Sequence, residues 1–129
     1  MDQQVDHRQI VRALACARIA VGATLLAAPR RAGGRWIGPA ADDGATRLAV
    51  RALAARDLAI GVGTLRALSG EEPARPWALA GAASDLVDAA ATVLALRRVG
   101  LRRAVPAVVI ALGAGAYTLS IADRIDPVD

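Results

Sequence analysis

Four long apolar stretches dominate the pattern of hydrophobic and polar positions along this chain. The most apolar, residues 104–122, contains no charged residue, and residues 77–96 carry only two acidic side chains. Residues 48–68 and 10–28 are also mainly apolar but include arginines. An α-helix needs about 20 apolar residues to cross the hydrocarbon core of a bilayer. The pattern therefore predicts an all-α, antiparallel four-helix transmembrane bundle that forms a single domain, 1–129, with helices over residues of about 8–28, 45–69, 76–97 and 103–123.

Two alternatives to membrane-spanning helices fit the pattern less well. Residues 10–28 have the length of a signal-peptide core, but Arg18 interrupts them, acidic residues precede them and three further apolar stretches follow. A water-soluble bundle of four amphipathic helices requires a polar face on each helix. Residues 104–122 offer only Tyr117, Thr118 and Ser120 for such a face. We therefore expect four membrane helices and no cleaved leader.

Arginines are concentrated in two of the three connectors between these stretches. The first connector holds Arg30, Arg31 and Arg35, and the third holds Arg97, Arg98, Arg102 and Arg103. The middle connector has only Arg75, beside Glu71 and Glu72. Because arginine-rich loops stay in the cytoplasm, we expect the first and third connectors inside and both ends of the chain outside a bacterial cytoplasmic (inner) membrane.

The amino-acid composition excludes several classes of function. Hydrophobic residues make up 55% of the chain and the net charge is +4, but aromatic residues are only 2%. A nucleic-acid interface would need aromatic platforms or a basic recognition face, so we expect no nucleic-acid partner. Cys16 is the single cysteine, which excludes a disulfide scaffold and suggests a small buried side chain. A lone His7 predicts no metal site, and no catalytic or cofactor-binding motif is present.

Six charged residues lie at a similar depth within the predicted helices, and we expect them to form an intramembrane polar network: Arg18, Arg51, Arg56, Asp57, Asp85 and Asp88. Isolated charges in a bilayer are costly, so these side chains should face each other or a wet cavity. Asp85 and Asp88 share a helix face. Arg51 and Arg56 point roughly 140° apart, so one of them must serve a different surface. The set is formally neutral.

Two interpretations of this network follow. In the first, the arginine–aspartate pairs lock the helices together and set their register. In the second, the charges surround a functional polar cavity that holds a headgroup or relays protons.

Short motifs along the chain also resemble a known group of proteins. They are Arg18-Ile-Ala-Val-Gly22 with Pro29, Trp36-Ile-Gly38, Arg51-Ala-Leu-Ala-Ala-Arg56-Asp57-Leu-Ala-Ile-Gly61, and Asp85-Leu-Val-Asp88. They resemble an uncharacterised family of small four-helix integral membrane proteins of high-GC Gram-positive bacteria, and the likeness covers nearly the whole chain. The resemblance implies the four-helix membrane fold and carries over no reaction, ligand or catalytic residue.

Three functional hypotheses follow from the sequence. The first is a non-enzymatic accessory or partner-binding subunit, which has the lipid bilayer and a membrane-protein partner or its own copies as partners. The second is a small proton-coupled transporter that acts as a homo-oligomer, with Asp85 or Asp88 exchanging the proton. The third is a lipid-modifying enzyme, with arginines for a phosphate headgroup and an aspartate as general acid.

Overall fold

The computed structural model describes residues 6–70 and 72–126, and all regular structure in these ranges is helical. Glu71, a connector charge considered above, and the two ends of the chain lie outside the described residues. The elements in chain order are α1 (His7–Ala27), α2 (Pro29–Ile37), η1 (Gly38–Asp42), α3 (Gly44–Ser69), α4 (Arg75–Leu94), α5 (Leu96–Val99), α6 (Leu101–Ile121) and η2 (Ala122–Arg124), where η marks a 3-10 helix.

The prediction of an all-α chain with several long apolar helices is confirmed, but two details differ. The helix predicted over 76–97 ends at Leu94, and α5 follows as a separate turn. The first connector, for which no helix was predicted, contains α2 and η1. Pro29 starts α2 because its fixed φ and missing N–H suit the first helical turn. Gly38 and Gly100 end α2 and α5 with φ values of 69° and 82°, which favour glycine.

Asp43 defines where α3 begins. Its carboxylate accepts a hydrogen bond from the backbone N–H of Thr46 at 2.8 Å and another from the Thr46 hydroxyl at 3.1 Å. These hydrogen bonds lower the pKa of the Asp43 carboxyl, because they stabilise its charged form. Asp43 is therefore an N-cap that separates η1 from α3.

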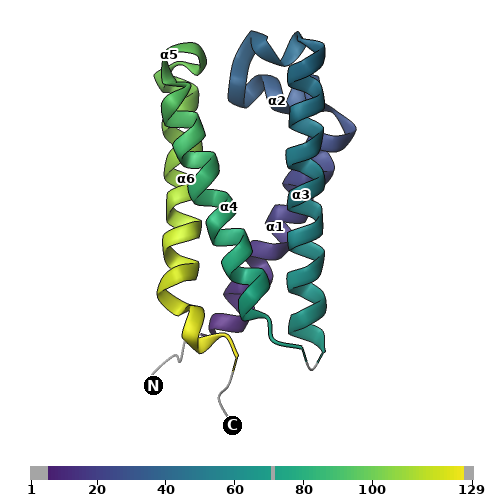
Figure 1. Cartoon of the computed structure of the whole chain (residues 1–129), viewed down its shortest axis with the longest axis vertical. Helices are drawn as coiled ribbons and strands as arrows, with labels where there is room; N and C mark the ends of the chain where they lie inside the picture. The colour runs from purple at the N-terminus through teal and green to yellow at the C-terminus, as the bar shows by residue number, and fades with distance from the viewer. Residues whose placement is uncertain (1–5, 71, 127–129) are drawn as a thin grey trace.

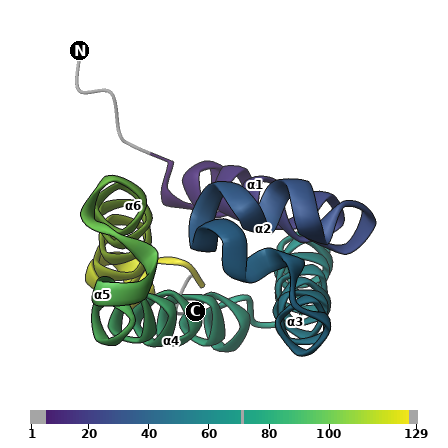
Figure 2. The same cartoon turned by 90° about the horizontal axis from the view of Figure 1, so that it is seen from above.

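The four long helices form two pairs (Figures 1 and 2). α1 packs along α3, and α4 packs along α6, whereas contacts between the pairs are fewer. Successive long helices run in opposite directions, so α2, η1 and α5 lie at one end of the molecule. The start of α1, the connection from α3 to α4 and η2 lie at the other end. In Figure 1 the two pairs diverge towards the end that carries α2 and α5.

Glycines allow α1 and α3 to approach closely. A Cβ atom added at Gly61 of α3 would lie 2.6 Å from Ile19 Cγ1 and 3.0 Å from the carbonyl oxygen of Ala15. A Cβ atom at Gly22 of α1 would lie 2.9 Å from the carbonyl oxygen of Ala54. Small residues at these crossings bring the two backbones into contact, as in packed membrane helices.

The end opposite α2 is closed by polar contacts to the C-terminal segment. The Asp126 carboxylate accepts hydrogen bonds from the backbone N–H groups of residues 74 and 75, both at 2.9 Å, and so caps the start of α4. Arg8 donates to the carbonyl oxygens of Ile125, at 2.8 Å, and Leu68, at 3.2 Å. These contacts join the starts of α1 and α4 with the end of α3.

Apolar side chains are distributed in the way expected of a membrane protein. The buried core is made mostly of alanines, and Ile125 is the one large side chain below 2% exposure among the described residues. By contrast Leu48, Leu94 and Ile110 are 71%, 89% and 71% exposed. A water-soluble bundle would bury such side chains, because exposed apolar area is costly in water. This surface disfavours the soluble alternative.

Three helices are long and apolar enough to cross a membrane, and they indicate a membrane protein: His7–Ala27, Arg75–Leu94 and Leu101–Arg124. α3 is not among them, because it carries Arg47, Arg51, Arg56, Asp57 and Arg66. The sequence predicted four such helices, so three of the four meet this criterion.

The expectation that Cys16 is buried is wrong, since its side chain is exposed. The buried residues of α1 are Val11, Ala15, Gly22 and Leu25. Cys16 lies about 100° further around the helix than Ala15, which turns it away from this face.

The glycine crossing predicts a specific loss of stability. We expect Gly61→Val to lower the free energy of unfolding by about 1–3 kcal/mol, because the new side chain must displace Ile19 and the α1 backbone. Gly113→Val is the matched control, since a Cβ there meets nothing within 4 Å. SDS-induced unfolding in mixed micelles, followed by circular dichroism, measures both. Equal losses in the two variants would contradict close packing at Gly61.

Candidate functional site

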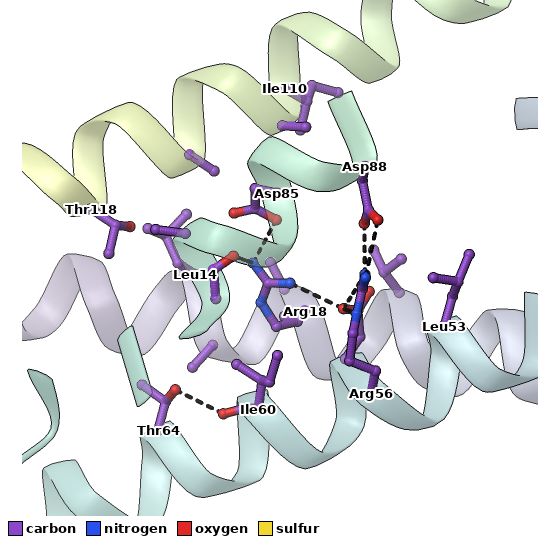
Figure 3. Close-up of a pocket in the computed structure, with 18 of the residues that line it drawn as sticks. Leu14, Arg18, Leu53, Arg56, Ile60, Thr64, Asp85, Asp88, Ile110 and Thr118 are labelled. Carbon is purple, nitrogen blue, oxygen red and sulfur yellow. Dashed lines mark hydrogen bonds and ion pairs between the residues drawn. The ribbon is translucent and has the colours of Figure 1, made fainter. Parts of the chain in front are cut away.

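Five of the six charged residues predicted to form a network meet between the two helix pairs. Arg18 comes from α1, Arg56 and Asp57 from α3, and Asp85 and Asp88 from α4. We call these five side chains the Arg/Asp cluster. Each lies near the middle of its helix. Figure 3 shows the side chains of Arg18, Arg56, Asp85 and Asp88 turned towards one another.

Arg18 connects three helices through its guanidinium group. Its Nη1 donates to Asp57 Oδ1 at 3.1 Å, and its Nη2 donates to Asp85 Oδ1 at 2.6 Å. Nη2 also donates to the carbonyl oxygen of Gly81 at 3.2 Å. Gly81 leaves room for the guanidinium, since a Cβ there would lie 3.4 Å from Arg18 Nη2. Charge-assisted hydrogen bonds of this kind are among the strongest in proteins.

Arg56 makes a two-pronged ion pair with Asp88. Its Nη1 donates to Asp88 Oδ1 at 3.1 Å, and its Nη2 donates to Asp88 Oδ2 at 2.6 Å. Nη2 also donates to Asp57 Oδ1 at 3.1 Å. The same carboxylate oxygen of Asp57 therefore accepts from both arginines, and Asp57 is only 9% exposed. Asp57 is the centre of the cluster.

Arg51 does not join the cluster. Its side chain is exposed, and it belongs to none of the ion pairs that the described residues form. The angle of roughly 140° between positions 51 and 56 gives the reason, because the rotation that turns Arg56 towards α4 turns Arg51 outwards.

The absence of Arg51 changes the charge of the site. The sequence predicted three arginines and three aspartates, a neutral set. The cluster contains two arginines and three aspartates, so its formal charge is −1 when all five groups are ionised. The arginines are each shared between two carboxylates, and one negative charge has no arginine of its own.

The cluster lines a cavity of about 300 Å³ between the two helix pairs. All four long helices contribute to its walls, and Trp36 of α2 contributes at one point. Most of the lining is aliphatic, including Leu14, Leu53, Ile60 and Ile110 (Figure 3). The cavity therefore combines an apolar wall with one charged patch, which is the usual composition of a small-molecule site.

Sequence reasoning missed several residues of this cavity. Trp36 lines the cavity, and its indole Nε1 is a buried donor with no partner among the described residues. Trp77 also lines the cavity. Thr64 lines it as well, but its hydroxyl already donates to the carbonyl oxygen of Ile60 at 2.8 Å. The available signal was the amphipathic pattern between Pro29 and Gly38, which the prediction of long apolar helices did not include.

No known protein family, curated protein or solved structure gives a match to this chain. The function must therefore be argued from the site.

Both guanidinium groups of the cluster are already paired with carboxylates, so neither is free to bind a phosphate headgroup. Across residues 6–70 and 72–126, no group of His, Cys, Asp or Glu side chains is arranged to hold a metal ion. Cys16 is exposed and is not among the residues that line the cavity.

The ion pairs predict a contrast between two arginines. Arg18→Met should lower the free energy of unfolding by on the order of 3 kcal/mol, because it leaves Asp85 without its partner in a largely buried site. Arg51→Met is the control and should not lower this free energy, since Arg51 is exposed and unpaired in the described structure. The same SDS unfolding assay measures both. Similar losses would mean that the cluster does not hold the helices together.

Proposed function

We propose that this chain is a multi-pass protein of the bacterial cytoplasmic membrane, in which α1, α3, α4 and α6 all cross the bilayer as an antiparallel four-helix bundle. Three of these helices have the required length and hydropathy. The arginine-rich connectors are at the end that carries α2 and α5 (Figure 1). This end is the cytoplasmic one by the positive-inside rule, and both ends of the chain are outside.

The ion pairs support α3 as the fourth membrane helix. Arg56 and Asp57, in the middle of α3, are both paired within the Arg/Asp cluster. Arg47 and Arg66 are near the helix ends, where long side chains reach the interface. Arg51 is exposed, about one turn towards the cytoplasmic end. Pairing and position together reduce the cost of these charges in a bilayer.

We also propose membership of the small four-helix membrane family of high-GC Gram-positive bacteria. The motifs that carry the resemblance include Arg18, Arg56-Asp57 and Asp85-Leu-Val-Asp88. These motifs supply every member of the Arg/Asp cluster.

For the activity, we propose a small proton-coupled carrier. The observation that supports it is the position of the Arg/Asp cluster on the wall of a cavity, where carboxylates can exchange protons next to a bound solute. A purely structural network would be expected in a packed interface without such a cavity. The excess carboxylate provides one exchangeable proton without breaking the pairing of both arginines.

A second candidate is an accessory subunit that binds a membrane-protein partner or further copies of itself. The outward face of α6 supports it, because Leu101, Val105, Val109 and Leu112 are 65%, 52%, 63% and 45% exposed. Gly113, with open space around it, would allow another helix to approach. Co-purification of the chain with one partner at fixed stoichiometry, with no transport activity, would favour this candidate.

The proposed orientation can be tested by cysteine labelling. Native Cys16 should not react with a membrane-impermeant maleimide in intact cells, because it faces the bilayer interior, and should react after denaturation in SDS. In a Cys16→Ala background, Ser69→Cys should be labelled from outside, and Ala40→Cys only after the cells are permeabilised. Labelling of Ala40→Cys in intact cells would contradict the orientation.

Carrier activity can be tested in proteoliposomes with two charged probes that cross lipid bilayers poorly, benzyltrimethylammonium and benzenesulfonate. We expect a pH gradient, acid inside for exchange against protons or acid outside for uptake together with protons, to drive uptake of one probe, and we expect the double variant Asp85→Asn, Asp88→Asn to lose this uptake. Asp42→Asn is the control, since its exposed carboxylate pairs with Arg30 far from the cavity. Uptake of neither probe, or uptake that is unchanged in the double variant, would count against a proton-coupled carrier.

A further inference from the structure

We propose that the cavity between the helix pairs is a binding site for a small organic cation with an apolar body, and that Asp85 is its counter-ion. This inference rests on the proposed carrier function, because it specifies the class of solute that the carrier takes.

One further positive charge would make the Arg/Asp cluster neutral. Two arginines and three aspartates leave a formal charge of −1 beside an apolar wall. A net charge in such surroundings is costly, and a bound monovalent cation or a proton removes it. An anion would be repelled by the same excess charge.

Asp85 accepts fewer hydrogen bonds from the arginines than Asp57 or Asp88 does. Asp88 is held by both prongs of Arg56, and Asp57 accepts from both arginines. Asp85 accepts from Arg18 alone, through Oδ1. Its second oxygen, Oδ2, accepts no hydrogen bond from the described residues. The fully buried side-chain atoms without a partner are Trp36 Nε1 and Ser84 Oγ, so Oδ2 is partly accessible. The carboxylate lines the cavity and is 14% exposed (Figure 3).

The groups that surround Asp85 favour a cation there. α1 presents Arg18, and α3 presents Arg56 and Asp57, while α4 adds Asp88 on the same face. Residues 104–121 of α6 carry no charged side chain. No further positive charge is therefore available from the four walls, so a bound cation or a proton has to supply it.

The rest of the cavity suits an apolar body. Its polar lining is confined to the cluster and a few hydroxyls, and aliphatic side chains such as Val21, Leu53 and Ile110 cover most of the wall. Trp36 and Trp77 also line it, and tryptophan faces attract cations. A volume of about 300 Å³ is at the lower end of the range for ligand pockets, so the solute is small.

A proton and the organic cation compete for the same negative charge. Binding of the cation should therefore weaken as the pH falls, since protonation of the cluster removes the charge that the cation neutralises. This competition is the exchange that a proton-coupled carrier needs, with one cation replaced by one proton on the Asp85 carboxylate.

The test is equilibrium binding to the full chain in nanodiscs of zwitterionic phosphatidylcholine, measured by calorimetry. We expect benzyltrimethylammonium to bind, and its uncharged isostere neopentylbenzene and the anion benzenesulfonate to bind at least about tenfold more weakly, a difference typical of one lost charge contact. Asp85→Asn should weaken binding of the cation by a similar factor, because Asn keeps an acceptor for Arg18 but removes the charge. Asp85→Glu should restore binding, and Asp42→Asn should leave it unchanged.

If Asp85→Asn fails to fold, a second variant that fills part of the cavity still tests whether the cation binds there. Ala111→Leu narrows the cavity from α6 without changing any charge, so it should also weaken binding of the cation. Helical content by circular dichroism identifies the folded variants. Equal binding of the three probes, or undiminished binding in folded Asp85→Asn, would overturn the proposal.

The binding and uptake experiments separate this inference from the proposed function. If the cation binds but neither probe is taken up, the carrier proposal fails and the cation site stands. If benzenesulfonate is the probe that is taken up, the carrier proposal stands and the cation site fails.

Discussion

The fold depends on one carboxylate oxygen that two arginines share. Asp57 Oδ1 accepts from Arg18 on α1 and from Arg56 on its own helix, and each arginine then reaches a different aspartate on α4. The α1/α3 pair and the α4/α6 pair have few other contacts along their length. Since apolar side chains gain little by meeting each other inside a bilayer, these ion pairs are the main directional force between the pairs.

Small residues make this arrangement possible. Gly61 and Gly22 bring α1 against α3, and Gly81 leaves the space that the Arg18 guanidinium fills. The same scarcity of large buried side chains leaves a cavity beside the cluster, because alanine and glycine cannot fill the space where the helix pairs diverge. Close packing within each pair and a cavity between the pairs thus have the same cause.

The two ends of the bundle differ in how their helices are held together. At one end the Asp126 carboxylate and Arg8 bind the backbone ends of α4 and α3 and hold the helices together. At the other end the pairs diverge and α2 lies on the side of α1 and α3, with Trp36 on the cavity wall (Figures 1 and 2). The bundle is therefore held by backbone caps at one end and by the Arg/Asp cluster near its middle.

The sequence by itself determined the long helices, their approximate bounds and the set of charged residues within them, because a long apolar run and a charge that interrupts it can both be read directly from the order of residues. Only the tertiary structure decided that Arg56 and not Arg51 faces α4, since the two positions differ by roughly 140° and the choice depends on how α3 is rotated against its neighbours. That rotation changed a neutral set into one with an excess carboxylate. It was also the tertiary structure that brought Trp36 to the cavity, because α2 is a short amphipathic helix between Pro29 and Gly38 and is not part of any long apolar run.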